Sequence, residues 1–197
     1  MSHYFLDDKN LKHRPKRISF SLDGVVLTFH TDTGVFSKDR LDFGTSTLLK
    51  NITVGDAKTL IDMGTGYGPI GIYLAYTNPQ TNVIMADVNP RAVALAKENL
   101  LLNNITNAKA VVSDLFKAID EKADLIVTNP PIRAGKQTVF RLYEEAYENL
   151  NSGGHFYCVI QKKQGAPSTL EKLKSLYPIV DVIDRAKGYW IILAKKD

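Results

Sequence analysis

Glycines crowd one short segment of the chain, and an acid precedes them. Residues 62–71 read DMGTGYGPIG, and Asp87 follows 19 residues after Gly68. A glycine-rich turn between a strand and a helix, with an acid about 20 residues further on, is typical of a nucleoside-cofactor site in which the acid binds the ribose. This spacing alone fits a nicotinamide cofactor as well as any other adenosine-containing one.

The charge of Asp62 separates these alternatives. Asp62 stands at the end of a short apolar run, two residues before Gly64. A pyrophosphate group needs the amides of the loop and of the following helix, and a carboxylate beside them would repel it. A cationic amino-acid tail or a sulfonium group would be stabilised there. Asp62 therefore favours a positively charged adenosine cofactor over NAD.

Asn129, Pro130 and Pro131 form a second chemical motif, which resembles the Asn-Pro-Pro motif of amino-group methyltransferases. The chemistry of that resemblance has a physical reason. An exocyclic purine amine is a poor nucleophile because its lone pair is delocalised into the ring. Two acceptors that take its two N–H hydrogens free that lone pair, and the Asn129 side-chain oxygen and the Pro130 carbonyl can serve as this pair. Proline fixes φ, so the carbonyls stay in place, and transfer by positioning needs no histidine base.

The apolar pattern predicts the elements that carry these residues. Asp23-Gly24 between two alternating apolar runs predicts an N-terminal β-hairpin. From about residue 58 onward, strands alternate with helices. We expect strands at 59–62, 82–87, 108–114, 124–129 and 155–160, helices at 69–76, 90–103 and 137–149 (closed by Gly153-Gly154), a last helix from the capping box Ser168–Glu171, and a final hairpin of 179–183 with 189–193.

This alternation predicts an α/β fold, a doubly wound parallel sheet with helices on both faces. In open sheets of this kind, ligands bind outside the carboxyl ends of the strands. Four polar residues stand at such ends, and we expect them to line one crevice: Asp62, Asp87, Asp114 and Asn129.

Length and composition bound the class of protein. Of the 197 residues, 44% are hydrophobic and 23% charged, which excludes disorder and predicts one domain. We expect residues 1–55 to form the hairpin and a substrate-side extension, and residues 56–197 to form the cofactor-binding core. One cysteine, four scattered histidines and no long apolar run predict a cytoplasmic protein without a disulfide, a metal site or a membrane span.

The formal net charge of +4 permits a polyanionic partner without requiring one. Residues 9–17 concentrate this charge, with five cations and no acid. Two interpretations stay open: a solvated basic face, or a patch that contacts phosphates. The same two interpretations apply to Arg133, Lys136 and Arg141.

Together, the glycine and Asn-Pro-Pro motifs resemble those of the class I S-adenosylmethionine-dependent methyltransferases. The segments HYF at 3–5, TGVFS at 33–37, DFG at 42–44 and NPPIRAGK at 129–136 narrow the resemblance to the small-domain, RsmC-like family. It covers essentially the whole chain. It implies a seven-stranded, mostly parallel sheet in the order 3-2-1-4-5-7-6, with strand 7 antiparallel.

The resemblance also implies roles for individual residues. Asp87 would bind the ribose hydroxyls, and Asp114 with the Leu115 amide would read the adenine edge. The residues implied to bind S-adenosylmethionine are Asp62, Gly64, Thr65, Gly66, Gly68, Asp87, Val88, Asp114, Leu115 and Asn129. The implied catalytic residues are Asn129, Pro130 and Pro131, and the implied substrate-binding residues are Phe36, Ile132, Arg133 and Lys136. Many related enzymes have an aromatic residue at the position of Ile132, so either Phe36 stacks on the acceptor base or Ile132 provides only an apolar wall.

We therefore expect methyl transfer to an exocyclic nucleobase amine, guanine N2 of small-subunit (16S) ribosomal RNA, with ribosomal RNA or the small subunit as partner. Methylation of a protein glutamine or a DNA adenine uses the same Asn-Pro-Pro chemistry and stays an alternative. So does a non-catalytic RNA-binding module on the same fold, although the four polar strand ends argue against it. The sequence leaves the oligomeric state open and slightly favours a monomer.

Overall fold

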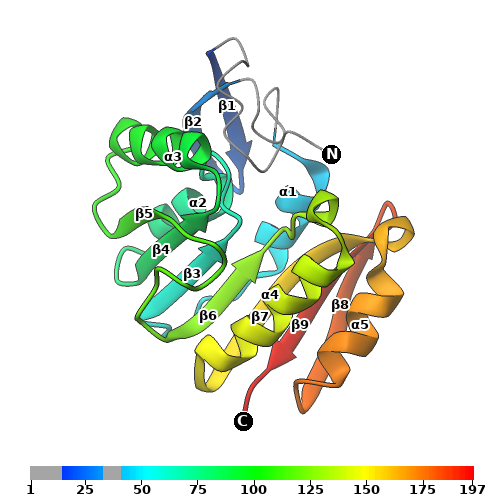
Figure 1. Ribbon diagram of the computed structural model, residues 1–197. Helices are drawn as coiled ribbons and strands as arrows, with labels where there is room; N and C mark the ends of the chain where they lie inside the picture. The colour runs from blue at the N-terminus through cyan, green and yellow to red at the C-terminus, as the bar shows by residue number, and fades with distance from the viewer. Residues whose placement is uncertain (1–14, 33–40) are drawn as a thin grey trace.

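A seven-stranded sheet forms the centre of the computed structural model, which describes residues 15–32 and 41–197 (Figure 1). In spatial order the strands are β5 (Ala108–Val112), β4 (Asn82–Asp87), β3 (Thr59–Met63), β6 (Ala123–Thr128), β7 (Leu150–Gln161), β9 (Tyr189–Lys195) and β8 (Ile179–Ala186). The first five run parallel, and β9 pairs antiparallel with both β7 and β8. This arrangement confirms the predicted strand order and the antiparallel last strand.

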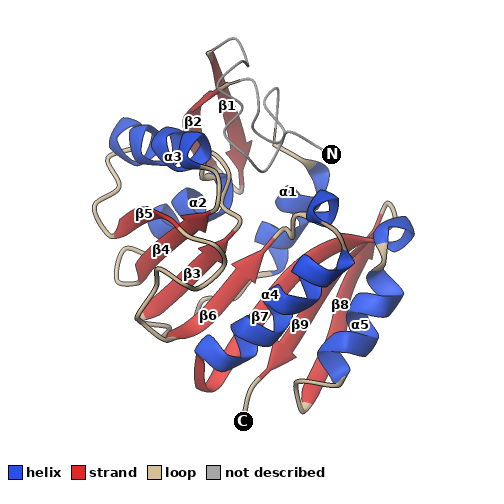
Figure 2. Ribbon diagram, viewed as in Figure 1, coloured by secondary structure: helices blue, strands red, loops and turns tan. Residues whose placement is uncertain are grey.

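Helices cover both faces of the sheet (Figure 2). On one face, α1 (Phe43–Asn51), α2 (Pro69–Thr77) and α3 (Pro90–Leu102) enclose a hydrophobic core. On the other face, α4 (Lys136–Asn149) and α5 (Ala166–Lys174) enclose a second one. The central strands β3 and β6 are buried on both sides, as their near-continuous apolar runs predicted.

The predicted N-terminal hairpin consists of β1 (Lys16–Leu22) and β2 (Val25–Thr31), joined by the turn at Asp23-Gly24. Both turn residues have positive φ, which matches the right-handed twist of the two strands. The apolar side of the hairpin, including Phe29, belongs to the same core as α1, α2 and α3. The hairpin is therefore packed on the sheet domain and does not stand apart from it.

Two asparagines of α3 attach the hairpin, because each side chain makes the two hydrogen bonds with the β2 backbone that a neighbouring strand would make. The Asn99 side chain accepts from the His30 amide (2.6 Å) and donates to the His30 carbonyl (2.9 Å). Asn103, one turn later, makes the same pair of bonds with Thr28 (3.1 and 2.8 Å). Asn99 also donates to the carbonyl of Tyr67 (2.8 Å), so it joins the hairpin to the glycine-rich loop.

Three details differ from the sequence prediction. Helix α1 was not predicted; its N-cap is Asp42, whose carboxylate accepts from the Thr45 amide. The capping box at Ser168 was wrong, because α5 begins at Ala166 after Gly165 and the Ser168 hydroxyl donates back to the Gly165 carbonyl (3.0 Å). Gly153-Gly154 does not close α4, because both glycines lie within β7, which begins directly after the helix.

We expect Asn99→Ala to lower the free energy of unfolding by about 2–4 kcal/mol, because it leaves buried backbone groups of the hairpin and the glycine loop without partners. Lys97→Ala, on the exposed side of the same helix, should change it by less than about 0.5 kcal/mol. Urea unfolding of both variants measures the difference. A loss no larger in Asn99→Ala than in Lys97→Ala would show that α3 does not hold the hairpin.

Candidate functional site

Asp62 lies at the end of β3 and closes the glycine-rich loop. Its Oδ2 accepts hydrogen bonds from the Thr65 hydroxyl (2.6 Å) and from the Gly71 amide in the first turn of α2 (2.9 Å). The side chain is fully buried, and its Oδ1 has no hydrogen-bond partner among the described residues. Burial raises the pKa of the Asp62 carboxyl to about 7. The carboxylate is therefore poised to gain from a positive charge nearby.

The loop amides already have acceptors within the protein. Gly64 and Thr65 both donate to the Ala86 carbonyl (2.8 and 3.0 Å), and Gly66 donates to Asp87 Oδ2 (2.9 Å). With Gly71 bonded to Asp62, the beginning of α2 receives a carboxylate of its own chain in place of a ligand anion. This geometry supports the electrostatic argument against a pyrophosphate at this loop.

Asp87 ends β4 beside the loop. Besides the bond from Gly66, it accepts from the Asn89 amide through Oδ1 (2.9 Å). Burial raises the pKa of the Asp87 carboxyl, and these backbone hydrogen bonds act in the opposite direction. The next residue, Val88, has 42% of its surface exposed.

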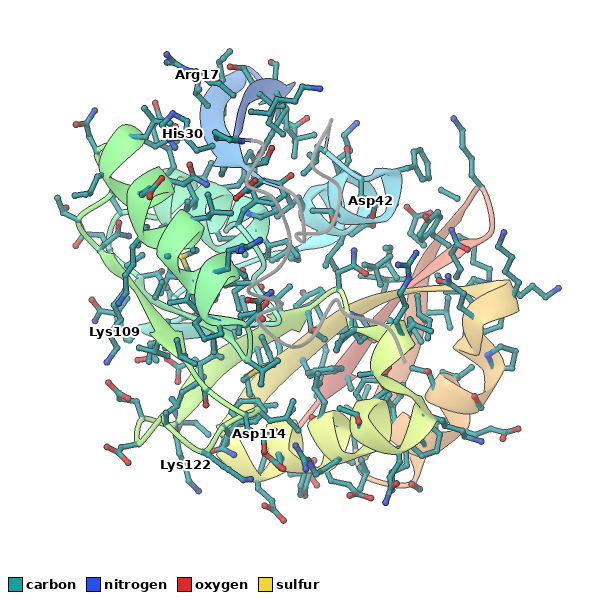
Figure 3. The ribbon with its side chains drawn as sticks, turned by 45° about the horizontal axis from the view of Figure 1, so that its top comes forward. Arg17, His30, Asp42, Lys109, Asp114 and Lys122 are labelled. Carbon is teal, nitrogen blue, oxygen red and sulfur yellow. The ribbon has the colours of Figure 1, made fainter. Side chains whose placement is uncertain are left out.

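Asp114 follows β5 and is more exposed than Asp62 or Asp87. Lys117 (2.6 Å) and Arg141 make ion pairs with it, and the hydrogen bond from Lys117 contributes most to lowering the pKa of its carboxyl. Leu115 has a positive φ, and the Ser113 hydroxyl donates to its carbonyl (2.5 Å). Figure 3 shows Asp114 and Asp42 on two sides of the carboxyl edge of the sheet.

Asn129 directly follows β6, and two residues of the α1 N-terminus hold its amide. Asn129 Nδ2 donates to the Thr45 hydroxyl (3.0 Å) and to Asp42 Oδ2 (3.3 Å). A carboxylate can only accept, so the NH₂ group must face Asp42. The side-chain oxygen accepts no hydrogen bond from the described residues, and it is left as the available acceptor.

Pro131 lies next to the glycine loop. A Cβ atom on Gly64 would be 3.9 Å from Pro131 Cδ, which brings the Asn-Pro-Pro segment next to the loop. The Pro130 carbonyl accepts from the Ile132 amide (2.9 Å) and keeps a second lone pair. The structure thus brings the two sequence motifs together at one edge of the sheet.

The structure describes only some of the predicted substrate-side residues. Ile132 begins the short helix η1 (Ile132–Ala134), is half-buried and packs against the α4–α5 core. Arg133 is exposed, and the exposed Lys136 extends over the Phe140 ring (5.0 Å). Phe36 and residues 9–14 of the basic segment lie outside the described residues. Lys16 and Arg17 are exposed on β1, and Arg17 is labelled in Figure 3.

Asp42 and Thr45 are the site residues that the sequence analysis did not assign. The available signal was an Asp three residues before a Thr at the beginning of a helix, which is a capping pattern. Within 15–32 and 41–197, no helix is long and apolar enough to cross a membrane. No group of three His, Cys, Asp or Glu side chains in those ranges could hold a metal ion.

Comparison with known proteins matches residues 26–193 to the model of the methyltransferase small domain. The chain belongs to this family. Among its family relatives, the Bacillus subtilis (strain 168) protein YbxB, described as uncharacterized, is 44% identical over 197 residues, with 98% of each chain covered. The ribosomal RNA small subunit methyltransferase C of Actinobacillus succinogenes is 34% identical over 86% of this chain.

A solved structure resembles the fold closely. It is the T. thermophilus 16S rRNA N2 G1207 methyltransferase (RsmC), in complex with AdoMet and guanosine, with a TM-score of 0.83 and 25% identity over 93% of this chain. The chain covers 51% of that structure and 48% of the Actinobacillus relative, so it spans about half of their length.

The raised pKa of Asp62 makes the stability of the ligand-free protein depend on pH. Its folded-state pKa of about 7 lies above the ordinary value of 3.8, so stability falls as pH rises from about 4 to about 7 and then levels off. Asp62→Asn can keep both hydrogen bonds and cannot ionise. Its stability relative to the parent should rise across this window by on the order of 4 kcal/mol. Urea unfolding of both proteins at pH 4 and pH 8 tests this; an equal difference in stability at the two pH values would contradict it.

Proposed function

We propose that this protein transfers the methyl group of S-adenosylmethionine to the exocyclic N2 amine of a guanine in small-subunit (16S) ribosomal RNA. The proposal rests on the geometry of Asn129. Its side-chain NH₂ group is bonded to Asp42 and Thr45, and its side-chain oxygen is available as an acceptor in the segment that lies beside the glycine-rich loop. The family supports methyl transfer, and the RsmC relatives support ribosomal RNA as the substrate class.

The residues around the loop fit S-adenosylmethionine, which supplies an electrophilic methyl group on a sulfonium sulfur when bound. The unpartnered Asp62 Oδ1 suits a ligand with positive charge, and a Cβ on Gly66 would meet nothing within 4 Å, so a ligand can approach the backbone. In this proposal Asp87 binds the ribose hydroxyls, and Asp114 with the Leu115 amide reads the adenine edge. Gly64, Thr65, Gly68, Val88 and Asn129 complete the proposed binding set.

Asn129 and Pro130 act on the target amine. The Asn129 oxygen and the free lone pair of the Pro130 carbonyl accept its two hydrogens, and the nitrogen lone pair turns toward the methyl group. Asp42 and Thr45 hold the asparagine amide so that its NH₂ end cannot take the place of the oxygen. The transfer would form the bond between the nitrogen and the methyl carbon and break the bond between that carbon and the sulfonium sulfur, which leaves S-adenosylhomocysteine as the product. The proton that the amine loses passes to water, so no side chain needs to act as a base.

The N-terminal region belongs to the proposed substrate side. Residues 1–197 would act as one methyltransferase domain, in which residues 1–55 border the substrate and residues 56–197 hold the cofactor. The hairpin, α1 and α2 share one hydrophobic core, which supports treating the two regions as parts of one domain. Phe36 or Ile132 would contact the target base, and Arg133 and Lys136 would contact the phosphates of the RNA. The partner would be ribosomal RNA or the small ribosomal subunit.

The proposal is tested with purified small ribosomal subunits from cells that lack this gene. Incubation with the protein and S-adenosylmethionine should produce one N2-methylguanosine in the 16S RNA, identified by mass spectrometry of nuclease fragments. Naked 16S RNA and a DNA duplex serve as parallel acceptors. Methylated adenine, or a methylated ribosomal protein without methylated RNA, would contradict guanine N2 as the target.

Asn129→Ala should lower the single-turnover rate about 100- to 1000-fold, because it removes one preorganised polar contact to the reacting group. Binding of S-adenosylhomocysteine, measured by calorimetry, should change far less, because Asp62, Asp87 and the glycine loop stay in place. Asn82→Ala, an exposed asparagine at the beginning of β4, is the matched control and should react like the parent. Near-normal turnover in Asn129→Ala would exclude this mechanism.

A further inference from the structure

The carboxyl edge of the sheet is divided by charge. Its β3–β4–β5 half carries Asp62, Asp87 and Asp114, described above. The half formed by β6, β7, β9 and β8 carries cations in three segments: 130–136 after β6, 161–165 at the end of β7 and after it, and 185–190 around the β8–β9 turn. These segments contain six Lys or Arg residues and no Asp or Glu. An acidic half beside a basic half can direct a polyanion to one side of this edge.

Three lysines of the basic half lie close together. The Lys162 amide, at the beginning of the short helix η2 (Lys162–Gln164), donates to the Gly188 carbonyl (2.8 Å), so η2 lies beside the β8–β9 turn. Lys162 and Lys163 on η2 and Lys187 in the turn are all exposed. None of them makes an ion pair with a described residue. We call Lys162, Lys163 and Lys187 the cationic rim.

Phe43 connects this rim to Asn129. The Lys187 ammonium lies 4.8 Å from the centre of the Phe43 ring, and the ring is tilted against Tyr189 (5.7 Å between centroids). Phe43 is 37% exposed and is the neighbour in the chain of Asp42, which accepts from Asn129 Nδ2 at 3.3 Å. An exposed aromatic ring therefore lies between the acceptor site and three uncompensated cations.

We propose that Phe43 and the cationic rim bind the single-stranded RNA that flanks the target base. The lysines contact its phosphates, and Phe43 stacks on a base next to the one that enters the site. Proteins that bind single strands combine the same two features, a basic track and aromatic rings. The inference rests on the proposed function, and it adds the direction of the strand: from Asn129 over the beginning of α1 toward η2 and the β8–β9 turn.

The test is the salt dependence of binding to a labelled, unstructured RNA oligonucleotide, followed by fluorescence anisotropy with the full chain. The triple variant Lys162→Ala, Lys163→Ala, Lys187→Ala should reduce the log–log slope by up to about 2, from roughly 0.7 per phosphate contact on a single strand. The matched control replaces Lys58, Lys122 and Lys174, which are exposed at the opposite edge of the sheet (Lys122 is labelled in Figure 3). Its slope should equal that of the parent.

Phe43→Leu separates stacking from charge. It should weaken RNA binding roughly 5- to 100-fold, the range expected for one stacked base, with an unchanged salt slope. Equal urea midpoints for the parent and all variants show that folding is preserved. An unchanged slope in the rim variant, an equal decrease in the control, or no measurable RNA binding by the parent would overturn the proposal.

The methylation assay on small subunits distinguishes this failure from failure of the proposed function. Methyl transfer that persists with an unchanged slope in the rim variant would exclude the RNA path alone. A reduced slope without any methyl transfer by the parent would exclude the reaction and leave the RNA surface in place.

Discussion

The hydrogen bonds that hold the Asn129 side chain are the constraint on which the proposed site depends. Thr45 and Asp42 come from the beginning of α1, and Asn129 comes from the end of β6. These bonds decide which end of the amide is available, because Asp42 can receive only the NH₂ group. They also join the part of the chain before the sheet to the centre of the sheet, so the proposed substrate-side and cofactor-side elements share this contact.

A second constraint is the buried carboxylate of Asp62. It serves the beginning of α2 as an internal anion and holds the glycine loop through Thr65 and Gly71. The arrangement costs stability at neutral pH, because one oxygen is buried without a partner. The same feature disfavours a negative ligand and favours a positive one. Together with the basic half, it gives the carboxyl edge of the sheet two regions of opposite charge.

Much of the fold could be predicted from the sequence, because parallel strands buried on both faces leave near-continuous apolar runs that end in polar residues. Those ends also located Asp62, Asp87 and Asn129 at one edge. Helix α1 was not predictable in this way. Gly44 is a poor helix residue, yet the helix requires it there, because a Cβ would lie 2.6 Å from the Tyr189 ring, a contact invisible in the sequence.

Orientation was equally out of reach. The Asn-Pro-Pro motif predicts which atoms accept hydrogen bonds from a target amine, but the partners that orient the Asn129 amide lie 84 and 87 residues earlier in the chain. The beginning of α5 was misplaced for a local reason: Gly165, with its left-handed backbone, begins the helix before the serine that has the stronger capping pattern. Local patterns predict helices and strands well, whereas contacts between distant segments decide how the side chains on them are oriented.

The hydrogen bonds from Asn129 Nδ2 to Thr45 and Asp42 are tested most directly by the single-turnover methyl transfer rate of Thr45→Val. Valine keeps the shape of threonine and removes the hydroxyl that accepts from Asn129 Nδ2. The rate should fall roughly 10- to 100-fold, because a misaligned catalytic group is sufficient for such a loss, while S-adenosylhomocysteine affinity stays within about twofold. Thr47→Val removes a hydroxyl that donates only to the Phe43 carbonyl of the same helix (2.8 Å), so this variant should react like the parent. A Thr45→Val rate equal to that of Thr47→Val would contradict the account.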